Sequence, residues 1–265
     1  MAVVEIIKEG PIAQLVLNRP EKLNVLNVDM PAELKKCTEE LKNVDDIRCV
    51  IVKGAGDHFM AGGDIDYFKS LADAYAKEGE PALPDDLFDI LHGAILNITH
   101  MNKPVIASVQ GAVAGFGLSL MLSCDVVIAA DNAVLSAAYC KIGLTPDGGV
   151  TYSLPRAVGQ KKAMELLLTG QRFTAEQGEQ WGMINQVVPA DLLHAKTLEL
   201  ATQLSDGPSD VLARTKKLLN QSSDVSLNAR LDDEADNFYS SMQRADFYEG
   251  VTSFCEKRPA KFNKP

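Results

Sequence analysis

The sequence has few of the features that mark disulfide-rich, membrane-spanning or nucleic-acid-binding chains. Its 265 residues include five cysteines, an odd number without CxxC spacing, which favours buried thiols over a disulfide framework or a zinc site. No uninterrupted apolar run reaches the length of a membrane span. The formal net charge is -10, so the phosphates of a nucleic acid or of an anionic membrane surface would be repelled.

Targeting signals are also missing from the two ends. The first ten residues, MAVVEIIKEG, lack a basic region followed by a long apolar stretch, and FNKP at the other end is no peroxisomal signal. We therefore expect a cytoplasmic protein. Hydrophobic residues make up 46% of the chain and charged residues 23%, which is typical of a globular protein with a large core.

Strands and helices are interspersed in the first part of the chain, and helices alone follow. Period-two and apolar runs predict strands at 3–8, 12–18, 48–53, 104–110, 125–130 and 134–137. Helical spacing predicts helices at 29–43, 64–75, 87–100, 115–123, 150–158, 161–168, 174–182, 189–205, 209–221 and 227–256. The polar stretch 77–86 is expected to be a mobile loop. This order predicts an α/β core over residues 1–195 and a helical region over 196–265.

Two glycine-bearing loops each lie between an expected strand and an expected helix. They are MAGGDI at 60–65 and GAVAGFG at 111–117. Small residues let a ligand approach the backbone, and the helix that follows presents unpaired N–H groups. If the loops converge, they could donate two backbone hydrogen bonds to one carbonyl oxygen, which is an oxyanion hole. The alternative is that these glycines serve tight turns and close packing.

A third segment, KIGLTPDGG at 141–149, places Asp147 between a proline and two glycines just before an expected helix. An aspartate in that position is a favoured N-cap, worth about 1 kcal/mol. A carboxylate near apolar neighbours can instead have a raised pKa and act as an acid or base. The four histidines show no metal-ligand spacing such as HExxH, so we expect no metal site.

Several ordered stretches together resemble the crotonase (enoyl-CoA hydratase/isomerase) superfamily over essentially the whole chain. They are LNRPEKLNVL at 17–26, FMAGGDI at 59–65, KPVIASVQG at 103–111, CD at 124–125, PRAVG at 155–159 and LTG at 168–170. The resemblance implies a ClpP-like spiral of ββα turns with C-terminal helices that support trimerisation. It also implies acyl-CoA thioester substrates, no separate cofactor, and a homotrimer or dimer of trimers.

The resemblance also implies positions for the site. The two oxyanion-hole N–H groups fall on Gly63 and Phe116, and the ring of Phe116 should shape the pocket. Coenzyme A should be held mainly by backbone along the first loop, with basic side chains as candidate contacts to its phosphates. The expected contacts are Ala61, Asp64, Ile65 and Asp66 in the loop, and Lys22, Lys257 and Arg258 outside it.

The sequence departs from the family pattern at the two catalytic glutamates, whose positions hold Ser119 and Tyr139. Neither side chain is an effective general base near neutral pH. The segment around Asp147 instead resembles a branch with an aspartate just before the following helix. That branch includes isomerases of phenylacetyl-CoA catabolism, so we predict an enoyl-CoA double-bond isomerase with Asp147 as the catalytic residue.

Three alternatives stay open. The first is a hydratase without the usual glutamate pair. The second is chemistry like that of a 4-chlorobenzoyl-CoA dehalogenase or a thioesterase, with Asp147 as nucleophile; His92 falls where the water-activating histidine would be, but Tyr139 replaces the positioning tryptophan. The third is a non-catalytic acyl-CoA binder; an RNA-binding role is disfavoured by the acidic charge balance.

Overall fold

The computed structural model describes residues 2–79, 83–84, 86–222 and 225–263. Six strands form one sheet in the order β1-β2-β3-β4-β6-β9, in which β1 and β2 are antiparallel and the other neighbours are parallel. The strands are β1 Val4–Glu9, β2 Ile12–Leu17, β3 Cys49–Gly54, β4 Val105–Val109, β6 Val126–Ala130 and β9 Gln186–Val188. A smaller sheet has the order β5-β7-β8, formed by Ala112–Ala114, Val134–Ser136 and Arg172–Thr174.

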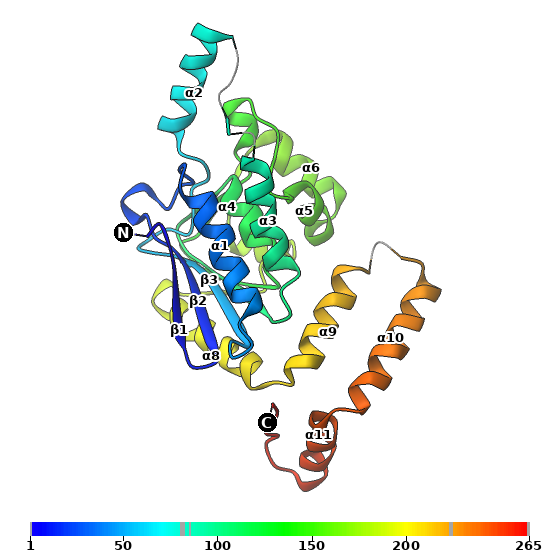
Figure 1. Cartoon of the computed structure of the whole chain (residues 1–265). Helices are drawn as coiled ribbons and strands as arrows, with labels where there is room; N and C mark the ends of the chain where they lie inside the picture. The colour runs from blue at the N-terminus through cyan, green and yellow to red at the C-terminus, as the bar shows by residue number, and fades with distance from the viewer. Residues whose placement is uncertain (1, 80–82, 85, 223–224, 264–265) are drawn as a thin grey trace.

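The central strands of the large sheet are buried on both faces, which is why they read as continuous apolar runs. Side chains alternate between the faces because the strand period is two. Along β3, Val50 and Val52 belong to the main core, whereas Cys49 and Ile51 belong to a second cluster on the opposite face. The first face carries α1 (Met30–Asn43) and α3 (Leu87–Thr99), and the second carries α8 (Leu193–Asp206) (Figure 1).

Successive segments repeat a strand of the large sheet, an extended piece of the small layer and then a helix. The clearest turn is β4, β5 and α4 (Phe116–Leu122). The turn before it runs from β3 through Met60, which bridges Val113 of β5, to α2 (Ile65–Glu78). The turn after it runs through β6 and β7 to the 3-10 helix η2 (Tyr139–Ile142). The spiral fold that the resemblance implied is confirmed, and it stacks the three strand-to-helix corners beside one another.

The helices after the spiral fall into two groups. Three lie close to β8 of the small sheet in the chain: α5 (Val150–Val158) and α6 (Gln160–Thr169) come before this strand, and α7 (Ala175–Gln180) comes directly after it. Three others lie beyond α8, where α9 and α10 run side by side below the core (Figure 1). They are α9 Ser209–Asn220, α10 Leu227–Met242 and α11 Ala245–Glu256. None of the described helices is both long and apolar enough to cross a membrane.

Some predicted boundaries are wrong. The single helix expected at 227–256 is two helices, because the chain is extended at Arg244 between α10 and α11. The three-residue strands β5, β8 and β9 were not predicted. The expected loop at 77–86 begins later, since α2 continues to Glu78, and part of it lies outside the described residues. The division into residues 1–195 and 196–265 stays a prediction.

Candidate active site

The two glycine-bearing loops meet at the corners of the spiral. Met60 N donates to Ala112 O at 3.1 Å, and Ala114 N donates to Met60 O at 2.9 Å. Gly62 and Gly115 both have positive φ, at 89° and 51°. A Cβ on Gly115 would lie 3.6 Å from Cα of Gly62. These glycines therefore permit a close approach of two main chains, and the convergence on which an oxyanion hole depends is present.

Gly63 in the first loop and Phe116 in the second each have an N–H group that donates no hydrogen bond within the described part of the chain. Around the first loop, Leu26 N donates to Gly62 O at 2.7 Å and Asp64 N donates to Leu26 O at 3.0 Å. The N–H of Gly63 between them is not used as a donor. Phe116 begins α4 after Gly115, and its N–H is one of the helix's unpaired first-turn donors. Both groups are free to donate to a ligand, and their role as an oxyanion hole stays a prediction.

Asp147 lies in a hydrogen-bonded group with the two residues at the glutamate positions. Tyr139 Oη donates to Asp147 Oδ1 at 2.6 Å. Ser119 Oγ lies 3.0 Å from Tyr139 Oη and donates to the main-chain oxygen of Asp147 at 2.9 Å. Ser119 is fully buried in α4, and Tyr139 is only 8% exposed at the start of η2. The spiral thus brings together side chains from three separate segments around one carboxylate.

Burial and hydrogen bonding act on this carboxylate in opposite directions. Burial raises the pKa of Asp147 above its ordinary value, while the Tyr139 hydrogen bond and the positive charge of His92 lower it; burial is the largest effect. The pKa of Tyr139 is raised by its own burial and by the adjacent Asp147 charge, so the phenol stays protonated and acts as the donor. Asp147 can therefore take up and release a proton, whereas Tyr139 holds its own.

The alternative that Asp147 caps the following helix is wrong. Helix α5 begins at Val150 after Gly149, and no side chain caps it. The carboxylate of Asp147 is turned toward Tyr139 instead. Gly148 keeps it there, because this residue has a φ of 59° and packs against the site; a Cβ on it would lie 2.8 Å from Cβ of Ser119 and 3.0 Å from the Phe116 ring. Phe116 is 2% exposed, and its ring packs against the turn that carries Asp147.

His92 lies on α3 with an exposed side chain, close enough to Asp147 for its charge to act on that carboxylate. Its ring also contacts that of Phe88, with centroids 5.8 Å apart. His58 has a different role, since its Nδ1 accepts from Ala112 N at 3.0 Å and so holds the second loop in place. Among the described residues, no group of three or more His, Cys, Asp or Glu side chains could hold a metal ion.

The expected coenzyme A contacts in the first loop lie together at the start of α2. Lys22 Nζ pairs with Asp66 Oδ2 at 3.2 Å across exposed surface, and Ile65 is 57% exposed. Asp64 is already engaged, because its Oδ1 accepts from Asp66 N at 3.1 Å and its Oδ2 lies 3.5 Å from Arg19. Ala61 N donates to Leu23 O at 3.0 Å. Their contact with a ligand stays a prediction.

Lys257 and Arg258 are not brought to this loop within one chain. They follow α11, whereas α2 projects from the opposite end of the molecule (Figure 1). Arg258 NH1 pairs with Glu249 at 2.6 Å, and Arg258 Nε pairs with Glu256 at 2.6 Å. Only a neighbouring subunit could carry these two cations to the first loop.

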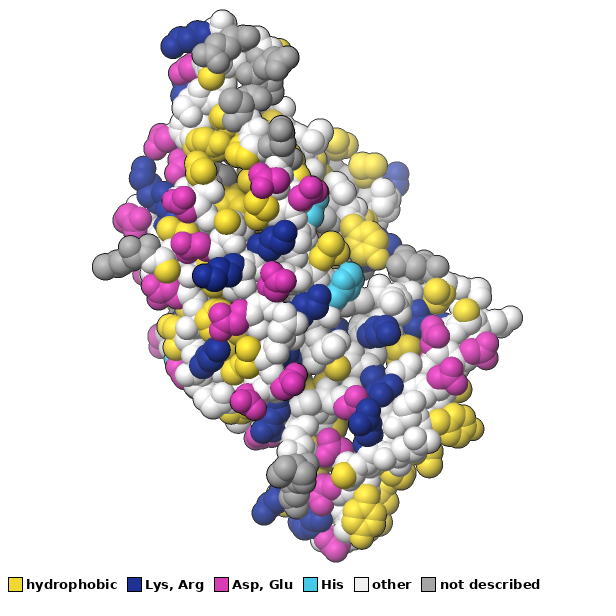
Figure 2. Space-filling view, in the orientation of Figure 1, with side chains coloured by type: hydrophobic (Ala, Val, Ile, Leu, Met, Phe, Trp, Pro, Cys, Tyr) yellow, Lys and Arg dark blue, Asp and Glu magenta, His cyan; other side chains and the backbone are white. Residues whose placement is uncertain are grey.

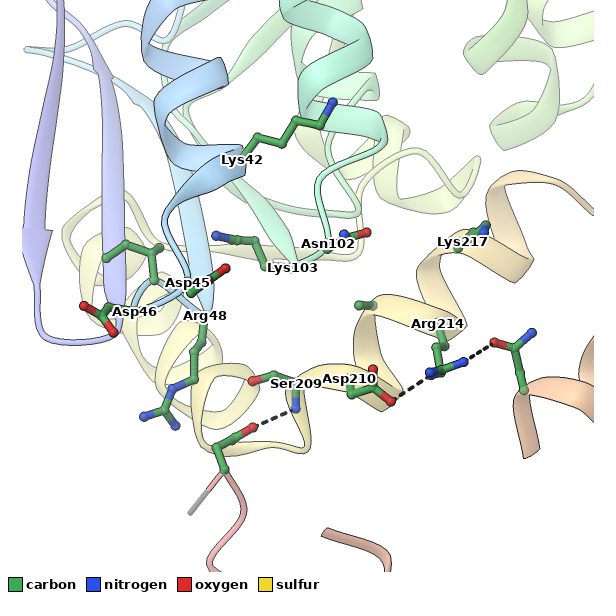
Figure 3. A pocket seen from close by; sticks show the side chains of 14 residues that line it. Lys42, Asp45, Asp46, Arg48, Asn102, Lys103, Ser209, Asp210, Arg214 and Lys217 are labelled. Atoms are coloured by element: carbon green, nitrogen blue, oxygen red, sulfur yellow. Dashed lines mark hydrogen bonds and ion pairs between the residues drawn. The ribbon is translucent and has the colours of Figure 1, made fainter. Parts of the chain in front are cut away.

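A cleft of about 670 Å³ lies elsewhere, at the junction of the core with α9 (Figure 3). Its lining mixes charges of both signs, including Asp45, Asp46, Lys103 and Arg214. Several of these are already partnered. Lys103 Nζ donates to the main-chain oxygens of Leu41 and Val44, and Arg214 Nε pairs with Asp210 at 2.7 Å. Asp147 and the two glycine-bearing loops do not line this cleft. We therefore regard it as the place where α9 meets the core, and not as part of the candidate active site.

Sequence reasoning missed the role of Ser119 and Tyr139. From the sequence, both residues are only replacements that remove a base. The signal that could have found them is their position, since side chains at the two glutamate positions of the family are expected to point at the reacting atoms. A donor at each position has an obvious acceptor in the one nearby segment that carries a carboxylate, around Asp147.

Comparison with known proteins finds relatives that match nearly the full length of this chain. The model of the enoyl-CoA hydratase/isomerase family matches residues 7–265. The 1,2-epoxyphenylacetyl-CoA isomerase of Escherichia coli is 37% identical over 257 residues, covering 96% of this chain and 95% of that protein. The crotonyl-CoA hydratase of Syntrophomonas wolfei is 33% identical over 256 residues, covering 96% and 95%. The crystal structure of an enoyl-CoA hydratase from Polaromonas sp. superposes with a TM-score of 0.91 at 34% identity, covering 98% of this chain and 99% of that one.

Proposed function

The chain belongs to the enoyl-CoA hydratase/isomerase family, and on that premise we propose that it is an acyl-CoA double-bond isomerase with Asp147 as its acid/base. The observation that carries the proposal is the carboxylate of Asp147, which is held by Tyr139 where the family's two glutamates are replaced by Ser119 and Tyr139. A single carboxylate suits isomerisation, because one group can remove a proton from one carbon and return it to another.

The reaction begins when Asp147 removes a proton from a carbon made acidic by the thioester carbonyl. The electron pair moves into the conjugated system, and negative charge collects on the thioester oxygen as a dienolate. The N–H groups of Gly63 and Phe116 donate to that oxygen and stabilise the charge. Protonated Asp147 then returns the proton at a second carbon, and the double bond has moved without gain or loss of atoms.

Two features support isomerisation over hydration. Hydration needs groups that hold and activate a water molecule, and a buried serine and tyrosine are poor at the second task. The similar protein from Escherichia coli is named an isomerase of an aromatic acyl-CoA, which supports the isomerase proposal and a place in aromatic catabolism. Other relatives are named hydratases, so hydration must be measured beside isomerisation.

The test is an activity panel with 3-enoyl, 2-enoyl and aromatic-ring CoA thioesters, comparing the wild type with Asp147→Asn. Isomerisation should fall roughly a hundredfold or more, given what one general base contributes. The matched control is Asp191→Asn, because Asp191 is exposed and makes no hydrogen bond or ion pair with the described residues. Near-normal isomerisation by Asp147→Asn would refute the proposal and make His92 the next candidate. Binding without turnover on the whole panel would favour the non-catalytic alternative.

Nucleophilic chemistry is the second candidate, favoured by the position of His92 near Asp147. In that case Asp147 would attack the substrate, a leaving group would depart, and water activated by His92 would hydrolyse the resulting ester. Mass spectrometry of the enzyme mixed with a halogenated benzoyl-CoA would reveal an aryl ester on Asp147. Isomerisation without any such adduct would exclude this candidate.

We also propose that the chain forms a homotrimer or a dimer of trimers. The C-terminal helices expose large apolar side chains, and Figure 2 shows hydrophobic surface along this part of the molecule. They include Leu219 (67% exposed), Leu227 (72%), Phe238 (66%), Tyr239 (66%), Tyr248 (74%) and Phe254 (86%). Such a surface needs a partner. A monomeric mass in light scattering at micromolar concentration would contradict the proposal.

A further inference from the structure

We propose that Tyr139 is a positioning residue that, supported by Ser119, fixes the orientation of the Asp147 carboxylate and keeps it ionised. This inference rests on the proposed role of Asp147 as the base. It assigns a task to the two residues that replace the family's glutamates. In this arrangement they hold the one carboxylate that performs the proton transfers.

The geometry divides the two oxygens of the carboxylate between different tasks. Oδ1 accepts the Tyr139 hydroxyl at 2.6 Å, a short charge-assisted hydrogen bond. Tyr139 is the one side chain among the described residues that donates to this carboxylate, so Oδ2 is the oxygen that would receive a substrate proton. Tyr139 is itself held, because its N–H donates to Ala137 O at 2.7 Å and its main-chain oxygen accepts from Leu144 N at 3.1 Å. The carboxylate is therefore fixed by a donor that cannot easily move.

Counting protons assigns the role of Ser119. The single proton of the Tyr139 hydroxyl is used on Asp147, so the 3.0 Å contact between Ser119 Oγ and Tyr139 Oη requires the serine proton. The same serine proton can instead reach the main-chain oxygen of Asp147 at 2.9 Å. Donation to the phenol oxygen polarises the Tyr139 hydroxyl and strengthens its bond to Asp147. Either arrangement ties the Asp147 turn to the buried helix α4.

The same contacts oppose the effect of burial on ionisation. The groups that act on Asp147 come from two elements, Tyr139 from η2 and His92 from α3. Burial raises the pKa of Asp147, and three influences lower it: the Tyr139 hydrogen bond, which is the largest of them, the charge of His92, and a hydrogen bond from the main chain of Asp147 itself. A base is active only when deprotonated, so loss of the phenol should move the acid limb of activity to higher pH.

The experiment measures kcat and kcat/KM against pH for the wild type and Tyr139→Phe. The acid limb should rise by about one to two pH units, the usual strength of a hydrogen bond to a charged group. On the high-pH plateau, where Asp147 is ionised in both proteins, kcat should still fall roughly tenfold because the carboxylate is less well oriented. KM should change little. Ser119→Ala should shift the limb in the same direction by a smaller amount, and Tyr75→Phe, at an exposed tyrosine on α2, should not shift it.

A second variant tests the hydrogen bond itself without removing the ring or the hydroxyl. Tyr139→3-fluorotyrosine has a more acidic phenol, which donates more strongly, so the acid limb should move to lower pH. A purely structural role predicts no shift for this variant. An unshifted limb in folded Tyr139→Phe, or in the fluorotyrosine protein if Tyr139→Phe does not fold, would overturn the inference. The proposed function is judged separately, by whether the wild type isomerises the CoA thioesters and Asp147→Asn does not.

Discussion

Lys216 joins the C-terminal helices to the core, and its removal should be among the most destabilising single changes in the chain. Its side chain is 9% exposed on α9, and its Nζ lies 2.8 Å from Asp125 Oδ2. The same ammonium donates to Ile98 O at 2.9 Å and to Lys103 O at 3.2 Å. Lys216→Ala leaves the Asp125 carboxylate, whose side chain is 23% exposed, and two main-chain oxygens without this donor, which should cost about 3 kcal/mol.

The loss should depend on pH, with a sign set by Asp125. Burial raises the pKa of Asp125 even though Lys216 lowers it, so the folded state holds the carboxyl proton more tightly than the unfolded state does. Folded-state stability therefore falls as pH rises from the ordinary aspartate pKa through the raised one. Without Lys216 the pKa rises further and this fall becomes larger. The difference between variant and wild type should be larger near neutral pH and shrink as the pH falls below the raised pKa of Asp125.

Urea unfolding followed by circular dichroism at several pH values measures this difference, and the melting temperature near neutral pH should fall on the order of 10 °C. Lys217→Ala is the matched control, because Lys217 is the next residue on α9 but is exposed. The double change Lys216→Met with Asp125→Asn should recover most of the stability, since a neutral pair has no unpaired charge and asparagine can still accept from Val105 N. A loss below about 1 kcal/mol, or one that does not change with pH, would refute this reasoning.

Three other changes have defined outcomes. Gly148→Ala should cost about 1–2 kcal/mol in urea unfolding and reduce isomerisation, because its φ of 59° is unfavourable and its methyl group would press on Ser119; unchanged activity would show that the turn carrying Asp147 tolerates displacement. Thr174→Ala should cost about 1 kcal/mol with activity unchanged, because it breaks the capping box of α7 with Gln177. Replacing Lys257 and Arg258 together with alanine should weaken coenzyme A binding in calorimetry, more so at low salt; unchanged affinity would remove both from the site.

The sequence predicts the elements whose pattern is decided locally. The apolar run of β4 predicts a buried strand, and the glycines at 62 and 115 predict two sharp turns of the chain. The strand and both turns are present in the structure. The break between α10 and α11 has no such signal, because the chain around Gln243 and Arg244 contains neither glycine nor proline. The three-residue strand β5 depends on pairing with β7, whose position only the folded spiral provides.

The same distinction between local pattern and tertiary structure applies to the candidate site. Asp147 could be selected from its segment together with the resemblance, but its local pattern alone favours a helix cap. What excludes the cap is the position of Tyr139, eight residues earlier in the chain, and of Ser119 on a different turn of the spiral. Direction of a side chain toward a partner in another segment is a property of the tertiary structure, so periodicity and propensity do not contain it.

The two unused N–H groups at Gly63 and Phe116 belong to the main chain, and this has a consequence for how the protein can evolve. No substitution of a side chain deletes a backbone donor unless it introduces proline or displaces the corner. The residues at 119, 139 and 147 are side chains on the neighbouring corners, and each can be exchanged singly. A lineage built on this scaffold can therefore keep the two donors that we propose stabilise a thioester enolate, while the proton donors, acceptors and nucleophiles around them change. The backbone donors persist because the path of the chain fixes them, whereas the side chains at 119, 139 and 147 can change by point mutation.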